Sequence, residues 1–190
     1  MKKKLFFIRH AETTWNQKNL CQGQKDIPLS QKGREEAKLL ANYLREFQID
    51  CIVSSPLCRA LDTAKEIHDL HPNAKFYTVA ELSERSWGAL EGISSKEMYD
   101  IEKLEENDPS YTPGKKVEER HEFRKRIYQG ISIAQSYDPH PLIVSHGRVF
   151  FEICLILGMP PIRQIPNCQL IEVAPNCNSW HVIFIKKPIL

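Results

Sequence analysis

The 190-residue sequence lacks any apolar run long enough to cross a bilayer. Its most apolar segment, Val149 to Leu157, is interrupted by Glu152, whereas a membrane-spanning helix needs about 20 apolar residues. The apolar stretch after the lysines near the start, Leu5 to Ile8, is also far shorter than the roughly 7–15 residues of a signal peptide. We therefore expect a soluble, cytoplasmic protein, and we interpret residues 5–8 as a buried strand.

The six cysteines lack the spacing of a metal or redox site. No two of them are arranged as Cys-x-x-Cys, so neither a zinc site nor a dithiol motif is predicted. In a reducing compartment the expected state is free thiols. A bond between Cys168 and Cys177 is the alternative for an exported protein.

The sequence also lacks a strong excess of charge of either sign. Its 26 basic and 24 acidic residues leave a net charge of +2. So weak an excess favours neither nucleic acid nor an anionic membrane as a partner, and we expect neither. Any binding of anions must come from where individual arginines lie. The sequence carries no signal for an oligomeric state.

Short apolar runs alternate with segments of helical periodicity, which predicts an α/β sheet in one domain spanning 1–190. Strands are expected at residues 5–8, 51–53, 76–79, 142–144, 169–173 and 180–185, and the last two should form a hairpin through Pro175 and Asn176. Helices are expected at 30–47 with Ser30 as N-cap, and from Pro56 to about 68 with Ser55 as cap. A third helix, with Phe123, Ile127, Ile131 and Ala134 on one face, should end at about Gln135, and a fourth should follow Gly147. The polar stretch 93–117 is expected to cross the sheet edge as a substrate-facing lid.

Two predicted strands run directly into histidines. The first strand continues into Arg9 and His10, and the strand at 142–144 continues into Ser145-His146-Gly147. The carboxyl ends of strands in an open α/β sheet are where sites assemble, so the two imidazoles should meet. A third strand end carries Arg59 on the first turn of the next helix, where backbone N–H groups favour an anion. Because guanidinium groups match phosphoryl oxygens in pairs, this set predicts a phosphoryl-binding pocket.

An ordered set of motifs spans nearly the whole chain, and it resembles the histidine phosphatase superfamily, the phosphoglycerate mutase-like family. The matching stretches are Phe7 to Thr13, Trp15-Asn16, Gln22-Gly23, Pro28 to Gly33, Ser54 to Ala60, Glu84 to Gly88, Glu91-Gly92 and Ser145 to Gly147. The resemblance implies a three-layer sandwich with a mostly parallel central sheet and helices on both faces.

The resemblance also assigns roles. It implies that His10 is the nucleophile, and that Glu84 is the general acid that protonates the leaving oxygen and then the base that activates water. Arg9, Arg59 and His146 would bind the phosphoryl oxygens. The substrate pocket would also be lined by Asn16, Gln22, Gly23, Gly147 and Arg148.

The chemistry agrees with these roles. A neutral imidazole is a good phosphoryl acceptor, and fixed cations stabilise the charge of the transition state, so no cofactor or metal is expected. An acid that is protonated at neutral pH needs a raised pKa. We therefore expect Glu84 to be partly desolvated or close to another carboxylate, with Glu81 and Glu12 as candidates.

The chain departs from the family pattern in two places. Ala11 follows the first histidine where glycine is common, and Pro113 to Val117 has the glycine but not the Glu-Ser pair of many relatives. The expected function is hydrolysis of a small phosphomonoester. The alternatives are a cofactor-dependent phosphoglycerate mutase and a non-catalytic sensor of phosphorylated ligands. The 61 residues between Glu84 and His146 favour hydrolysis, because the resemblance implies a longer insertion at this place in true mutases.

Overall fold

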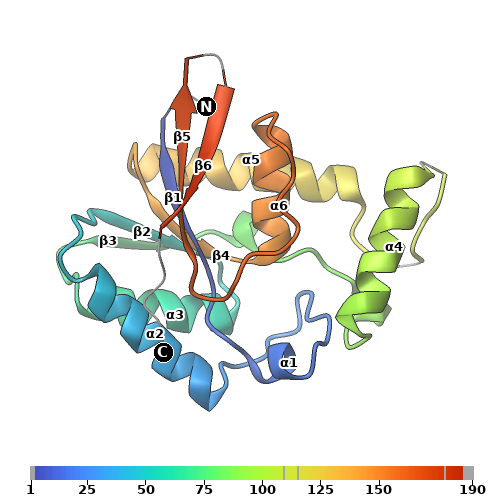
Figure 1. Ribbon diagram of the computed structural model, residues 1–190, viewed down its shortest axis with the longest axis horizontal. Coiled ribbons are helices and arrows are strands. Elements are labelled where there is room, and N and C mark those ends of the chain that lie inside the picture. The colour runs from blue at the N-terminus through green and yellow to red at the C-terminus, as the bar shows by residue number, and fades with distance from the viewer. Residues whose placement is uncertain (1–2, 109, 115, 178, 186–190) are drawn as a thin grey trace.

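The computed structural model of the chain describes residues 3–108, 110–114, 116–177 and 179–185. Its centre is a six-stranded sheet in the order β3-β2-β4-β1-β5-β6 (Figure 1). The strands are β1 Leu5–Arg9, β2 Cys51–Ser54, β3 Lys75–Thr78, β4 Leu142–Ser145, β5 Leu170–Asn176 and β6 Ser179–Phe184. The first four strands in this order pair in parallel, and β5 and β6 add an antiparallel edge. The expected mostly parallel sheet is confirmed.

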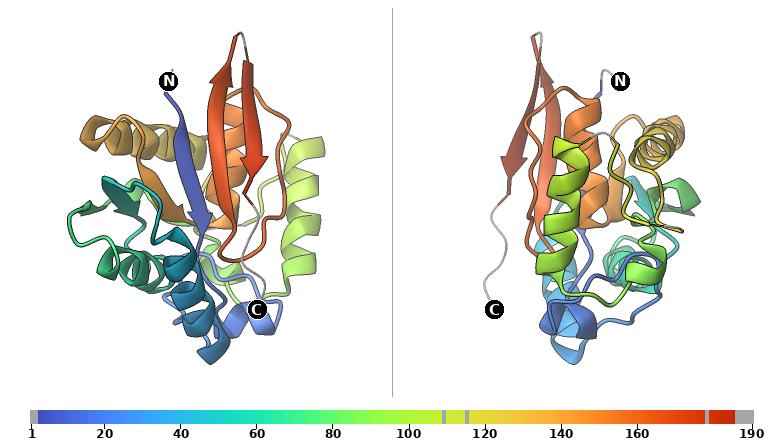
Figure 2. Two further views of the ribbon diagram at one scale, coloured as in Figure 1. Left: turned by 60° about the vertical axis from the view of Figure 1, so that its left-hand side comes forward. Right: turned by 90° about the vertical axis from the view of Figure 1, so that its right-hand side faces the viewer.

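Helices cover both faces of the sheet (Figure 2). Alternate residues of a strand point to opposite faces, so Ile8 packs with α2 (Gln31–Leu44) and α3 (Cys58–Asp69). Its neighbour Phe7 packs on the other face with α5 (Arg120–Tyr137) and α6 (Gly147–Ile156). The two apolar clusters make three layers, as expected.

The helix α2 follows its sequence signals closely. Ser30 is the N-cap, and its hydroxyl accepts a hydrogen bond from the backbone N–H of Gly33 at 2.9 Å. The buried face carries Ala37, Leu40, Ala41 and Leu44, which lie three or four residues apart on one side of the helix. The helix ends at Leu44, three residues before the predicted end.

The start of α3 was predicted wrongly. The helix begins at Cys58, and Leu57 is the N-cap without a side-chain hydrogen bond. The hydroxyl of Ser55 accepts a hydrogen bond from the N–H of Leu57 before the helix begins. Pro56 therefore belongs to the turn between β2 and α3, although Arg59 still lies in the first helical turn.

The hairpin of β5 and β6 was also predicted with the wrong turn. Pro175 pairs with Trp180 and Asn176 pairs with Ser179, so both residues belong to β5. Pro175 is tolerated because proline is accepted at strand ends and in edge regions of a sheet. The connection therefore follows Asn176.

The polar stretch after Ser94 contains a helix that the sequence analysis missed, α4 (Ser95–Asn107). Ser94 and Glu97 form a capping box at its start. Figure 1 shows α4 at the side of the molecule, away from the two helical layers. Three short elements complete the fold: α1 (Thr14–Gln17), η1 (Ala80–Leu82) and η2 (Gly88–Leu90).

Among the helices that the structure describes, none combines the length and apolar character needed to cross a membrane. None of the six cysteines forms a disulfide in the described part of the chain, so the alternative of a bond between Cys168 and Cys177 is not observed. Cys168 is buried, whereas Cys177 is exposed.

Candidate active site

The two histidines meet at the carboxyl ends of adjacent strands. β1 and β4 pair in parallel with Arg9 opposite Ser145, and the backbone N–H of His10 donates to the carbonyl of Ser145 at 2.9 Å. With this register, the segments that follow β1 and β4 leave the sheet at the same end. The ring centroids of His10 and His146 consequently lie 5.3 Å apart.

The imidazole of His10 is buried and oriented by its own backbone. Its Nδ1 lies 2.7 Å from the carbonyl oxygen of Ala11. Because a carbonyl only accepts, Nδ1 carries the proton and Nε2 has the free lone pair. Burial lowers the pKa of His10 well below its usual value, and the nearby Arg59 and Arg9 lower it further. His10 is therefore a neutral base with Nε2 available.

His146 is assigned the same tautomer, with its proton on Nδ1. Its Nε2 lies 2.8 Å from the hydroxyl of Ser55, which accepts from the N–H of Leu57 and has its own proton to donate to the imidazole. Nδ1 then carries a proton, and this buried atom has no partner among the residues described. Burial lowers the pKa of His146 well below its usual value, with Arg59 and His10 adding to the effect. His146 is thus a neutral hydrogen-bond donor.

Arg9 and Arg59 are held by carbonyl groups. Nη1 of Arg9 donates to Ile165 at 2.6 Å, and Arg59 donates to Lys25 at 2.8 Å and to Gly23 at 2.7 Å. Carbonyl partners fix a guanidinium without neutralising it. The Nε atoms of both arginines are buried without a partner in the described part of the chain, so both retain charge and donors for an anion.

Glu84 lies opposite, on the segment after η1. Its carboxylate accepts from the N–H of Arg85 at 2.9 Å and from the N–H of Arg148 at 3.3 Å. The side chain is half-buried, so the expected partial desolvation is confirmed. Its electrostatic partners include the cations Arg9 and Arg59.

The carboxylates expected beside Glu84 were named wrongly. Glu12 points elsewhere, since its oxygens bind Ser30, Gln17 and Lys32. Glu81 does not line the pocket, and its Cβ faces Gly130 of α5. The carboxylate that interacts with Glu84 is Glu102 of α4, which the sequence analysis did not consider because α4 itself was missed.

One pocket contains nine of the ten residues singled out from the sequence, namely Arg9, His10, Asn16, Gln22, Gly23, Arg59, Glu84, Gly147 and Arg148. His146 is fully buried behind His10. The amide oxygens of Asn16 and Gln22 accept hydrogen bonds from Thr13, which leaves their amino groups as donors. Gly23 has a φ of +53°, and a Cβ there would lie 2.2 Å from a Glu91 oxygen, so only glycine fits.

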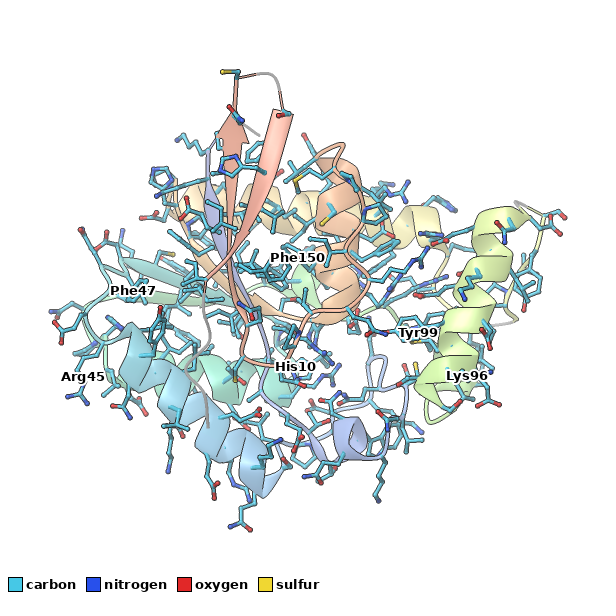
Figure 3. All side chains as sticks on the ribbon, in the orientation of Figure 1. His10, Arg45, Phe47, Lys96, Tyr99 and Phe150 are labelled. Carbon is cyan, nitrogen blue, oxygen red and sulfur yellow. The ribbon has the colours of Figure 1, made fainter. Side chains whose placement is uncertain are left out.

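Further lining residues were not identified from the sequence. Met98 and Tyr99 come from α4, and Arg163, Gln164 and Ile165 come from the loop before β5. Figure 3 shows Tyr99 on the side of α4 that faces the rest of the molecule, toward His10. Asn167 was also missed: its amide donates to the carbonyl of His10 at 2.8 Å and fixes the loop after β1.

The buried His10 should make the free protein less stable in acid. Its folded-state pKa is depressed, so below about pH 6.5 the unfolded chain binds a proton that the folded protein does not. The unfolding free energy is therefore unaffected by this proton above the unfolded pKa, and it decreases as the pH falls below that pKa. Between about pH 6 and pH 5 the unfolding free energy of the wild type should fall by about 1 kcal/mol per pH unit more than that of His10→Gln. Urea unfolding in phosphate-free buffer measures both slopes, and equal slopes would contradict a neutral, buried His10.

Comparisons with known proteins agree with this geometry. A model of the histidine phosphatase superfamily (branch 1) matches residues 5–187. A protein of Bacillus subtilis named Uncharacterized phosphatase PhoE is 33% identical over 183 residues, which cover 92% of this chain and 90% of that protein. The Probable phosphoglycerate mutase GpmB of Yersinia enterocolitica is 31% identical over 189 residues, which cover 93% and 86%. The crystal structure of phosphoglycerate mutase from Bacillus anthracis superposes with a TM-score of 0.79 at 23% identity, covering 96% of this chain and 92% of that one. The fold is thus the phosphoglycerate mutase-like one.

Proposed function

The chain belongs to the histidine phosphatase superfamily (branch 1), whose members are enzymes of phosphoryl transfer, and from this premise we propose that it hydrolyses a small phosphomonoester through a phosphohistidine on His10. The observation that carries the proposal is the group of buried donors around His10. Nε of Arg9, Nε of Arg59 and Nδ1 of His146 have no partner among the described residues. Three buried donors beside one neutral imidazole match a tetrahedral anion next to its acceptor.

In the first step, the lone pair of His10 Nε2 attacks phosphorus while the bond to the leaving oxygen breaks. Glu84, in its acid form, gives its proton to that oxygen. The hydrogen bond from Nδ1 to Ala11 directs Nε2 at the phosphoryl group and stabilises the positive charge that develops on the ring. The leaving group departs as an alcohol, and the phosphoryl group stays on Nε2.

In the second step, the Glu84 carboxylate accepts a proton from water while the water oxygen attacks phosphorus. The phosphorus–nitrogen bond breaks and its electron pair returns to Nε2. Inorganic phosphate leaves, and His10 and Glu84 regain their starting states. Arg9, Arg59 and His146 donate to the equatorial oxygens in both steps, and each such donor contributes a factor of roughly 100–1,000 in rate. Asn16, Gln22, Gly23, Gly147 and Arg148 would line the rest of the substrate pocket.

We also propose that the segment 93–117, built around α4, is a lid over this pocket. Tyr99 and Met98 of α4 line the pocket together with His10. The helix contacts the body of the protein through an apolar cluster, in which Met98 packs with Cys21 and Trp87, and through ion pairs, including Arg85 with Glu105 at 2.7 Å. A segment that lines the pocket from the side of the molecule is placed to cover a bound substrate.

A phosphoglycerate mutase activity is the second candidate, since the GpmB relative carries that name. Two assays separate the candidates: release of phosphate from a panel of phosphorylated metabolites, and conversion of 3- to 2-phosphoglycerate. We expect phosphate release to dominate. Efficient interconversion with little phosphate release would replace hydrolysis by mutase activity, and binding without either reaction would indicate a sensor.

Removal of divalent metals is expected to leave the activity unchanged. The pocket takes its positive charge from arginine side chains, which remain charged at any relevant pH. Phosphate release should therefore agree within error before and after dialysis against EDTA, with a metal-dependent phosphatase as the positive control. A large loss that returns on adding Mg²⁺ would contradict the mechanism.

A cytoplasmic location remains part of the proposal, and the lack of disulfides among the described cysteines supports it. The substrate is proposed to be a small phosphorylated molecule, with neither nucleic acid nor a membrane as partner. The near balance of charge supports this restriction.

A further inference from the structure

Arg148 is a buried cation of the pocket that the two chemical steps do not use. It is the second residue of α6, is 7% exposed and lines the pocket. Its Nη1 is buried and has no hydrogen-bond partner within the described ranges. A buried N–H of a guanidinium without an acceptor is costly, so its presence in the pocket points to a ligand atom.

The side chain of Arg148 is fixed from two sides. Its Nε donates to Oε1 of Glu102 on α4 at 2.7 Å, and its Cζ lies 4.0 Å from the centroid of the Phe151 ring. Glu102 and Phe151 are themselves buried. The guanidinium is thus held before substrate arrives, which reduces the entropy lost on binding.

The backbone of Arg148 lies beside Glu84, the proposed proton donor to the leaving group. Its N–H donates to Glu84 at 3.3 Å, and Glu84 is the group that protonates the leaving oxygen. The Arg148 side chain therefore begins where the carbon skeleton of the substrate departs from the phosphoryl group. A second functional group on that skeleton would face this guanidinium rather than Arg9 or Arg59.

The charge on Arg148 is only partly neutralised. Burial raises the pKa of Glu102 to about 7, although Arg148 and Arg85 oppose this rise. The contact of Glu102 with Nε of Arg148 also leaves Nη1 without an acceptor among the described residues. A single, partly neutralised guanidinium with a free N–H suits one further negative charge, such as a carboxylate, better than a second phosphate dianion.

We propose that Arg148 binds a carboxylate of the substrate, so that the enzyme acts on small phosphomonoesters whose carbon skeleton also carries a carboxylate, and that Glu102 positions Arg148. This inference rests on the proposed hydrolysis at His10. It identifies the substrate class through the side chain that recognises it. Arg148 is then the residue that sets specificity.

Pairs of substrates that differ in the carboxylate test the inference. 3-Phosphoglycerate is compared with glycerol 3-phosphate, and O-phosphoserine with O-phosphoethanolamine, with p-nitrophenyl phosphate as a measure of hydrolysis itself. In at least one pair, kcat/KM should be about 10- to 100-fold higher for the substrate that carries the carboxylate. This is the effect expected from the loss of one hydrogen bond between charged groups. If p-nitrophenyl phosphate is hydrolysed and neither pair shows this preference, the inference is wrong. If nothing is hydrolysed, the proposed function fails instead.

Variants assign the preference to Arg148. In Arg148→Met the preference should fall to within about threefold of unity, and Arg148→Lys should keep part of it. Arg124→Met is the matched control, because Arg124 pairs with the buried Glu152 at 2.7 Å but does not line the pocket; it should keep the full preference. A preference that survives in folded Arg148→Met overturns the inference, and if that variant does not fold, Arg148→Lys decides in the same way.

The positioning role of Glu102 has its own readout. In Glu102→Gln, KM for the carboxylate substrate should rise several-fold. The kcat values, and KM for the substrate of the pair that lacks the carboxylate, should change little. A purely structural role would instead lower kcat for both members of a pair. Equal effects on both members would remove Glu102 from the proposal.

Discussion

His10→Ala is expected to abolish turnover while the protein remains folded. Without Nε2 no phosphorus–nitrogen bond can form. Hydrolysis would then require direct attack by a water molecule that the pocket does not align in place of the imidazole. The loss in kcat should be at least about 10,000-fold, as for other enzymes that lose their nucleophile. Phosphate release at saturating substrate measures it, and a thermal melt checks the fold. Because His10 is buried and its protonation is disfavoured, its loss should not remove a stabilising ion pair.

The matched control for this variant is His121→Ala. The side chain of His121 is 75% exposed and lies at the start of α5, so its loss should leave turnover unchanged. Substantial residual hydrolysis in folded His10→Ala would require another nucleophile. The nearby thiol of Cys21 is a poor one, since burial raises its pKa to about 12.

Glu84→Gln is expected to slow both chemical steps and to show which one is slower. For an alkyl phosphate, kcat should fall by about 100- to 10,000-fold, because the alkoxide leaves without a proton. With p-nitrophenyl phosphate the leaving group needs no proton, so the first step should remain fast. Water activation then limits the reaction, and the variant should give a burst of about one p-nitrophenolate per enzyme followed by slow turnover. Stopped-flow absorbance measures the burst.

Glu81→Gln is the matched control for this variant. Glu81 is a neighbouring carboxylate that does not line the pocket, so the substitution should leave kcat close to that of the wild type. If Glu84→Gln slows the two substrates equally and gives no burst, then Glu84 orients groups without transferring a proton. The proposed acid and base would have to be sought elsewhere in the pocket.

The convergence of the proposed catalytic residues was predictable because sheet geometry determines most of it. Arg9-His10 and His146 lie at the ends of short strands that begin with apolar residues, and parallel neighbours end at the same edge. Arg59 follows another such strand, β2, which pairs with β4. Three strand ends therefore meet without any need to know side-chain conformations. The resemblance to the family then added the roles.

The part of the pocket built by α4 was not predictable from apolar periodicity. The buried residues of α4 are Met98 and Glu102, and a buried glutamate looks like a surface residue in the sequence. Glu102 is buried because Arg148, about 46 positions later in the chain, pairs with it. Such a tertiary partner leaves no local pattern. The capping box of Ser94 and Glu97 was the one local signal for this helix.

The misplaced boundaries have a similar origin. Ser55 and Pro56 look like a helix start, but the Ser55 hydroxyl is held by His146. This contact between distant segments keeps residues 55–57 in a turn and delays the helix to Cys58. The choice of Glu12 as a neighbour of Glu84 failed because Glu12 accepts from the Ser30 hydroxyl at the start of α2 instead. In both cases a long-range hydrogen bond decided between two locally reasonable outcomes.

The most direct test of the account is to trap the phosphorylated enzyme. Glu84→Gln is mixed with p-nitrophenyl phosphate, quenched in alkali and digested, and the peptides are examined by mass spectrometry and ³¹P NMR. We predict one phosphoryl group on Nε2 of His10, stable in alkali and lost in acid, and none in the variant that also carries His10→Ala. Phosphate found on another residue, or rapid turnover with no phosphorylated enzyme at any time, would contradict the phosphohistidine mechanism.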